Sequence, residues 1–249
     1  MGEQSEVKFG NIKENSMDDE ETRQSLLDVI KINTGKTVQF RMVLLARVND
    51  DQQNNQSAIS TFFESLLQDA QMHLGALTGL LLLYPVQCVA VVEGAYESIQ
   101  YIINFFSNPT KYEDYMSKVK LLVVSSNVQR HYKMLHKKNL NLVAPRVEGD
   151  YSSPEPIEIL VGEVLSQLGV IGRHLSGLSQ IAASKELESI QEKKPEAIVS
   201  QDLLGFLLNS KEIASPEEYT SFYKKARRVI LDENSVWPIR ARLLDQIEQ

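Results

Sequence analysis

Cysteine is nearly absent from this chain, since Cys88 is the only one among 249 residues. A single cysteine cannot form an internal disulfide, and a chain without disulfides is expected in a reducing compartment inside the cell. Cys88 lies in an apolar stretch, and this position predicts a small buried side chain.

Basic charge is also scarce, because 26 Lys and Arg stand against 33 Asp and Glu, for a formal net charge of -7. Nucleic-acid binding depends on clustered Lys and Arg, so no nucleic-acid partner is expected. The apolar stretch at residues 76–94 is interrupted by Pro85, Gln87 and Glu93, so we expect neither a membrane span nor a membrane partner. The first residues are polar and acidic and predict no secretory signal, which makes a cytoplasmic protein the expectation.

Motifs that carry chemistry are missing as well. The chain has no glycine-rich phosphate loop and no serine nucleophile elbow, so no enzyme activity is expected. Glu93 is the one acidic residue within the apolar stretch at residues 76–94. It is expected to cap or hydrogen-bond the turn into the next helix. Four histidines lack cysteine or acidic residues at metal-ligand spacing, which predicts no metal site; they are His73, His131, His136 and His174.

What the sequence does contain is a pair of apolar strands at residues 76–94, joined by a tight turn at residues 84–87. Proline at position 85 cannot donate a ladder hydrogen bond and therefore belongs in the turn. Hydrophobic periodicity predicts further elements on both sides of this hairpin. They are a strand at 38–48, a helix at 57–74, a helix at 95–107 and a strand at 118–128.

The predicted order is strand, helix, strand, strand, helix, strand, which is the ferredoxin-like pattern of an α+β protein. Right-handed crossovers place both helices on one face of a four-stranded antiparallel sheet. The other face is too apolar for water and must be covered. The predicted division is a disordered acidic arm (1–35), the α+β domain (36–135), a polar connection (136–156) and a C-terminal helical region (157–249).

A long helix is predicted at residues 157–183, with an apolar seam at alternating spacings of four and three. The seam includes Val161, Val164, Leu168, Ile171 and Leu175. One interpretation packs this helix on the open face of the sheet, and the other makes it a partner-binding or dimer helix. Four glycines on the same helix predict close backbone packing; they are Gly162, Gly169, Gly172 and Gly177. Further along, Ser215 and Glu218 predict a capping box for another helix.

Positive charge concentrates at one place only. The residues are Arg130, His131, Lys133, His136, Lys137 and Lys138. This segment is interpreted either as a solvated loop or as a docking patch for an acidic protein surface such as that of tubulin.

The core residues resemble a known family. Leu77-Thr78-Gly79, an apolar strand and Val92-Glu93-Gly94 match the spacing of the BLUF domain, a flavin-binding blue-light sensor, over residues 38–130. The resemblance implies a flavin between the two core helices and a switch made of a tyrosine, an asparagine and a glutamine. Those positions hold Ala46, Met72 and Ala90 here, whose side chains cannot replace the lost hydrogen bonds. No cofactor is therefore expected.

The whole chain further resembles a vertebrate testis-expressed family with a degenerate BLUF-like domain. This resemblance implies a non-enzymatic structural protein of the sperm flagellar axoneme, with axonemal or cytoskeletal proteins as partners. The expected contact residues are four of the basic residues, Arg130, Lys133, Lys137 and Lys138, together with the helical seam. The alternative is a ligand-sensing module that still binds a flavin or another planar molecule between the core helices.

Overall fold

The structure is a computed structural model that describes residues 38–49, 51, 56–140 and 155–224. The described residues from Gln39 onward belong to one unit. The predicted acidic arm at 1–35 and the end of the C-terminal helical region, 225–249, lie outside the described residues.

The predicted order of the α+β core is confirmed, and most element boundaries agree within two residues. The elements are β1 (Phe40–Val48), α2 (Gln56–Leu74), β2 (Thr78–Leu83), β3 (Gln87–Gly94), α3 (Tyr96–Phe106) and β4 (Met116–Ser126). A short 3-10 turn, η2 (Pro109–Lys111), links α3 to β4, and the side chain of Asn108 accepts the Thr110 N–H at its start.

The sheet has the strand order β4-β1-β3-β2-β5. The pairs β4–β1, β1–β3 and β3–β2 are antiparallel, which is the ferredoxin-like arrangement. The predicted four-stranded sheet is incomplete, because β5 (Leu135–Asn139) lies in the segment interpreted as connection or loop and pairs in parallel with β2. Without β5, the outer edge of β2 would present unpaired backbone groups, and a short lysine-bearing strand is a common way to close such an edge.

Gly79 has a steric role at the start of β2. A Cβ built on Gly79 would lie 2.1 Å from the carbonyl oxygen of Val91 on β3. On the other side, the Gly79 N–H donates to the Met134 carbonyl at 3.1 Å. The backbone is therefore held too closely between its two neighbours for any side chain.

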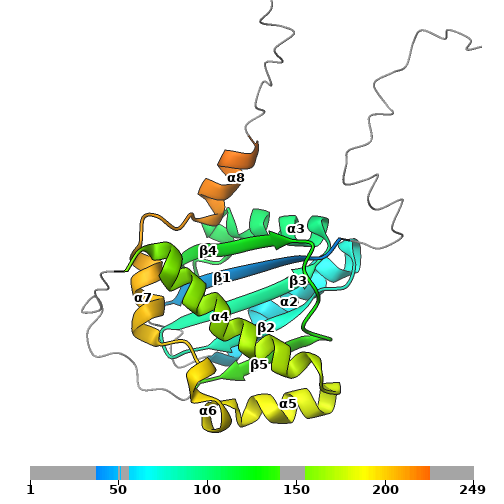
Figure 1. The fold of residues 1–249 in the computed structure, drawn as a ribbon. Helices are drawn as coiled ribbons and strands as arrows, with labels where there is room; N and C mark the ends of the chain where they lie inside the picture. The colour runs from blue at the N-terminus through cyan, green and yellow to red at the C-terminus, as the bar shows by residue number, and fades with distance from the viewer. Residues whose placement is uncertain (1–37, 50, 52–55, 141–154, 225–249) are drawn as a thin grey trace, which may run out of the picture. The chain divides into compact units, whose positions relative to one another are not determined.

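One face of the sheet is covered by α2 and α3 (Figure 1). The predicted apolar spacing of both helices is confirmed, since Phe63 of α2 and Phe106 of α3 are buried against the sheet. Cys88 lies in the same core and is fully buried, as expected. Burial raises the pKa of its thiol to about 12, because a thiolate there would lose its hydration.

The opposite face is covered by α4 (Ile157–Ser176), which crosses the sheet (Figure 1). The remaining cover consists of α5 (Gln180–Glu188), α6 (Ile190–Lys193), the 3-10 turn η3 (Pro195–Ala197) and α7 (Gln201–Asn209). The single predicted helix at 157–183 is wrong in one respect. The first helix ends at Ser176 with Gly177 as its C-cap, and Ser179 starts α5 by accepting the Ala182 N–H with its side chain.

The four glycines of the predicted helix differ in their surroundings. Gly172 packs closely against the segment before β5 as predicted, because a Cβ there would meet the His131 ring at 2.7 Å and the Tyr132 hydroxyl at 3.0 Å. A Cβ on Gly162 or Gly177 would meet nothing within 4 Å, so the prediction of close packing is wrong for those two.

The last described helix is α8 (Pro216–Lys224), which packs on α3. The predicted capping box is confirmed. The Glu218 N–H donates to Ser215 Oγ at 3.1 Å, and the Ser215 N–H donates to Glu218 Oε2 at 2.7 Å. A 2.6 Å hydrogen bond between the hydroxyls of Ser107 and Thr220 ties α8 to the end of α3.

Candidate functional site

The three positions of the flavin switch do not come together. Ala46 and Ala90 lie on the sheet face below α2 and α3 and are both buried in that core. Met72 on α2 is 66% exposed and faces solvent instead. Neither alanine offers a hydrogen bond, so this part of the molecule has no side-chain switch at the matched positions.

Aromatic rings pack where the start of α2 meets the end of α3. Phe63 of α2 lies 5.9 Å from Phe106 of α3, measured between ring centroids. Phe62 stacks on Tyr115 at 4.7 Å, and Phe106 lies 5.4 Å from Tyr112. These rings are packed as in a protein core, and a planar cofactor would have to displace them.

Glu93 connects three parts of the fold. Its side chain is fully buried, and its Oε1 accepts hydrogen bonds from Arg41 Nε at 2.8 Å and Arg41 Nη2 at 2.5 Å. Its Oε2 accepts the backbone N–H groups of His131 at 2.9 Å and Tyr132 at 3.2 Å. Glu93 therefore fastens the segment before β5 to the sheet. The prediction that Glu93 would cap or hydrogen-bond the turn into α3 is therefore wrong. Sequence patterns did not pair Glu93 with Arg41, which lies opposite it on β1.

The predicted basic patch is engaged within the molecule. Lys137 Nζ donates to Glu64 of α2 at 2.5 Å, and Lys133 Nζ donates to the Leu178 carbonyl at 2.6 Å. Lys138 Nζ donates to the Glu188 carbonyl at 2.6 Å, and Arg130 donates to Gln39 Oε1 at 2.7 Å. The interpretation as a loop is corrected, since Leu135–Asn139 form β5, and the cations tie this strand to elements on both faces of the sheet through hydrogen bonds that remain exposed. The interpretation as a docking patch stays a prediction.

His136 and Tyr132, the other notable side chains of this segment, are buried. Burial lowers the pKa of His136 below the ordinary histidine value, so this ring is neutral near pH 7. In the part of the chain that the structure describes, no group of three His, Cys, Asp or Glu side chains could hold a metal ion.

The apolar seam of α4 faces the sheet. Val164, Leu168, Ile171 and Leu175 are all buried in the core below α4, and Val161 is partly buried at its margin. The interpretation that packs this helix on the open sheet face is confirmed. The seam is therefore occupied within the chain and is not presented to a partner.

The surface over α3 and α8 was not singled out from the sequence. We call it the aromatic surface and define it as Phe40, Tyr96, Tyr219, Phe222 and Tyr223. Phe222 and Tyr223 are 56% and 65% exposed. The Tyr219 and Tyr223 rings lie 4.5 Å apart, and Phe40 lies 5.3 Å from Tyr96. Burial raises the pKa of Tyr219, and its neighbours Tyr223 and Tyr96 add to the shift.

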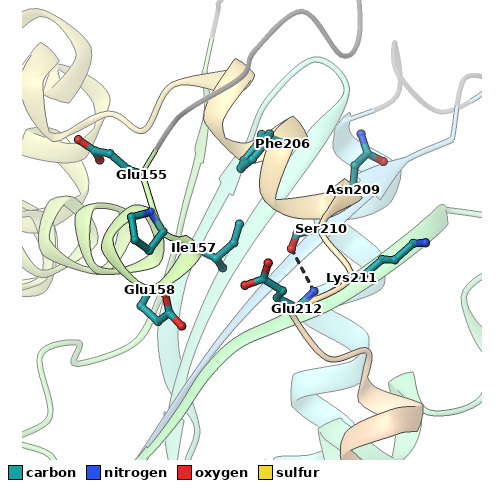
Figure 2. Close-up of a pocket in the computed structure, with 9 residues that line it drawn as sticks. Glu155, Ile157, Glu158, Phe206, Asn209, Ser210, Lys211 and Glu212 are labelled. Atoms are coloured by element: carbon teal, nitrogen blue, oxygen red, sulfur yellow. Dashed lines mark hydrogen bonds between the residues drawn. The ribbon is translucent and has the colours of Figure 1, made fainter.

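A groove of about 590 Å³ lies where α4 begins and α7 ends. Ile157 and Phe206 lie on facing sides of it, while Lys211 extends away (Figure 2). Its rim carries the carboxylates of Glu155, Glu158 and Glu212. Three carboxylates disfavour an anionic ligand such as a flavin nucleotide at this place.

No helix within the described ranges is long and apolar enough to cross a bilayer. The described part of the molecule combines a ferredoxin-like sheet extended by one parallel edge strand, two helices on one face, and a C-terminal helical layer on the other.

Solved BLUF proteins are similar to this chain at low identity. BlrB, a BLUF protein in its dark state, shares 18% identity over 53% of this chain and 98% of its own, with a TM-score of 0.35. BlrP1 from Klebsiella pneumoniae shares 18% identity over 42% of this chain, with a TM-score of 0.33. A bacterial light-regulated adenylyl cyclase shares 14% identity over 61% of this chain, with a TM-score of 0.35. The chain spans only 25% and 40% of those two proteins. The fold assignment rests on the strand order and register.

A family model named testis-expressed protein 47 matches residues 38–225, which include all of the described elements. The chain belongs to the testis-expressed protein 47 family.

Proposed function

We propose that this chain is a non-enzymatic interaction protein of male germ cells and a structural component of the sperm flagellar axoneme. The family is named for expression in testis, which supports the proposal of a role in male germ cells. The proposed partners are other axonemal or cytoskeletal proteins, and the proposed location is the cytoplasmic interior of the flagellum.

The observation that carries the proposal is the aromatic surface. Phe222 and Tyr223 expose more than half of their side chains on a short helix that is already anchored to α3. Exposed aromatic residues are enriched at protein interfaces, because they bury large areas and still offer hydroxyl groups. Glu217 and Glu218 lie on the same helix, which favours a partner with apolar and basic residues.

The test uses tagged chains expressed in germ cells and sperm extracted with detergent. The native chain should remain with the axoneme, and a Phe222→Ser, Tyr223→Ser double variant should move to the soluble fraction. Met72→Ser is the matched control, because Met72 is equally exposed but lies on α2. Full release of the native chain by detergent would overturn the proposal.

The alternative function, flavin sensing between α2 and α3, makes a different prediction. A chain that binds flavin keeps a blue absorption band after desalting. We expect no retained band, because aromatic rings pack between the start of α2 and the end of α3 and the matched switch positions on the sheet hold the buried alanines Ala46 and Ala90. A stoichiometric band would replace the scaffold proposal with ligand sensing.

A further inference from the structure

A second cavity lies on the other side of the sheet, between α4 and the strands β1, β3 and β4. It has a volume of about 120 Å³. Its floor consists of Val43, Val91 and Val123, which neighbour one another across the three strands. Leu165 and Leu168 of α4 close it from above. The floor and roof are therefore apolar.

One wall of this cavity is polar. It is formed by Arg41, Ser125, His131 and Tyr132. Gly169 of α4 also lines the cavity, and a Cβ built there would lie 3.2 Å from Arg173 Nη1. The missing side chain at position 169 thus leaves room for a second guanidinium group beside the cavity.

The charges near this wall are unbalanced. Within the described ranges, Arg41 and Arg173 each carry a positive charge, whereas Glu93 supplies one negative charge and is already bonded to Arg41, His131 and Tyr132. Burial lowers the pKa of His131, and the charges of Arg41 and Arg173 lower it further while Glu93 opposes them. The His131 ring is therefore a neutral hydrogen-bonding group near pH 7. The net charge of Arg41, Arg173 and Glu93 beside this wall is positive.

We propose that this cavity binds a small organic carboxylate with a short apolar tail. The carboxylate lies at the wall of Arg41, Ser125 and His131 within reach of Arg173, and the tail lies on the valine floor. Guanidinium groups bind carboxylates through charge-assisted hydrogen bonds. The volume is well below the roughly 300–1,000 Å³ of sites for drug-sized ligands, which excludes flavins and nucleotides. This site is independent of the proposed axonemal contact, which lies over α3 and α8.

The experiment is an NMR titration of the full chain, labelled in its Val and Leu methyl groups, at constant ionic strength. The probes are butyrate, butan-1-ol and butylammonium chloride. Butyrate should give saturable shifts at Val43, Val91, Val123 and Leu168. The alcohol should give weaker shifts there, and the ammonium ion should give none. Equal shifts from butyrate and butylammonium would overturn the proposal in favour of binding that ignores charge, and no saturable shift from butyrate would overturn it in favour of a cavity that holds no carboxylate.

Two variants locate the binding. Gly169→Leu fills the cavity and should abolish the butyrate shifts, whereas Gly162→Leu on the open side of the same helix should leave them unchanged. Arg173→Gln removes one exposed cation and should weaken butyrate binding about tenfold without loss of folding. Unchanged affinity in Arg173→Gln would contradict the assigned charge contact, even if Gly169→Leu fails to fold.

Discussion

At the residue scale, the ion pair of Glu93 with Arg41 joins a fully buried carboxylate to a guanidinium group that is 21% exposed. Glu93→Gln leaves Arg41 without its counter-charge and places an amide group opposite N–H donors that need an acceptor. Breaking one partner of a buried pair costs about 3 kcal/mol, and we expect a loss of that size in the free energy of unfolding by urea.

The matched control for this prediction is Glu64→Gln. Glu64 pairs with Lys137 at 2.5 Å, but both side chains are about half exposed. Exposed pairs contribute less than about 1 kcal/mol, so the control should unfold close to the native midpoint. Equal losses in the two variants would show that burial of Glu93 does not govern its contribution.

The second prediction at this scale concerns two glycines. Gly79→Ala places a Cβ 2.1 Å from the Val91 carbonyl oxygen, which forces β2 and β3 apart. We expect a loss of roughly 3 kcal/mol by thermal denaturation. Gly162→Ala has open space and should instead stabilise the chain by about 0.5–1 kcal/mol, because alanine favours the helix. A stable Gly79→Ala variant would contradict the steric reason given for this glycine.

At the element scale, the start of α8 depends on its capping box. Ser215→Ala removes the oxygen that accepts the Glu218 N–H, at a local cost of about 1 kcal/mol. Hydrogen exchange should become faster at the first amides of α8, with little change in the sheet. Ser221→Ala, later in the same helix, removes only a hydroxyl bonded to the Glu218 carbonyl and should leave those amides protected. Similar exchange in both variants would contradict the role of the cap.

At the scale of the whole molecule, the sheet and the C-terminal helices share one core. Leu45, Leu82 and Val89 of the sheet are buried together with the seam of α4. The sequence divided the chain into an α+β domain at 36–135 and a helical region at 157–249. The shared core predicts that the α+β part does not fold stably by itself.

The measurement compares residues 36–140 with residues 36–224. The shorter chain loses α4 to α8 and exposes an apolar sheet face, so it should bind a hydrophobic dye and elute as an aggregate. The longer chain should elute as a compact species and unfold cooperatively. Cooperative unfolding of the shorter chain without dye binding would support two separate domains.

The sequence by itself determined the order of the α+β core and the cap of α8. Strand and helix periodicity are local signals, and a capping box spans only four residues, as Ser215 and Glu218 show. The burial of Cys88 followed in the same way from its apolar neighbours. The seam of α4 was also visible, although its spacing alone could not say whether it faced the sheet or a partner.

Only the tertiary structure decided what the basic segment does. The stretch at 135–139 has no strand signal of its own and becomes β5 because the edge of β2 is open beside it. Its cations bond to Glu64, Leu178 and Glu188, which lie far away in the sequence. The cavity beside Arg41 likewise forms only where α4 crosses three strands. Such features depend on contacts between distant segments, and local patterns do not encode them.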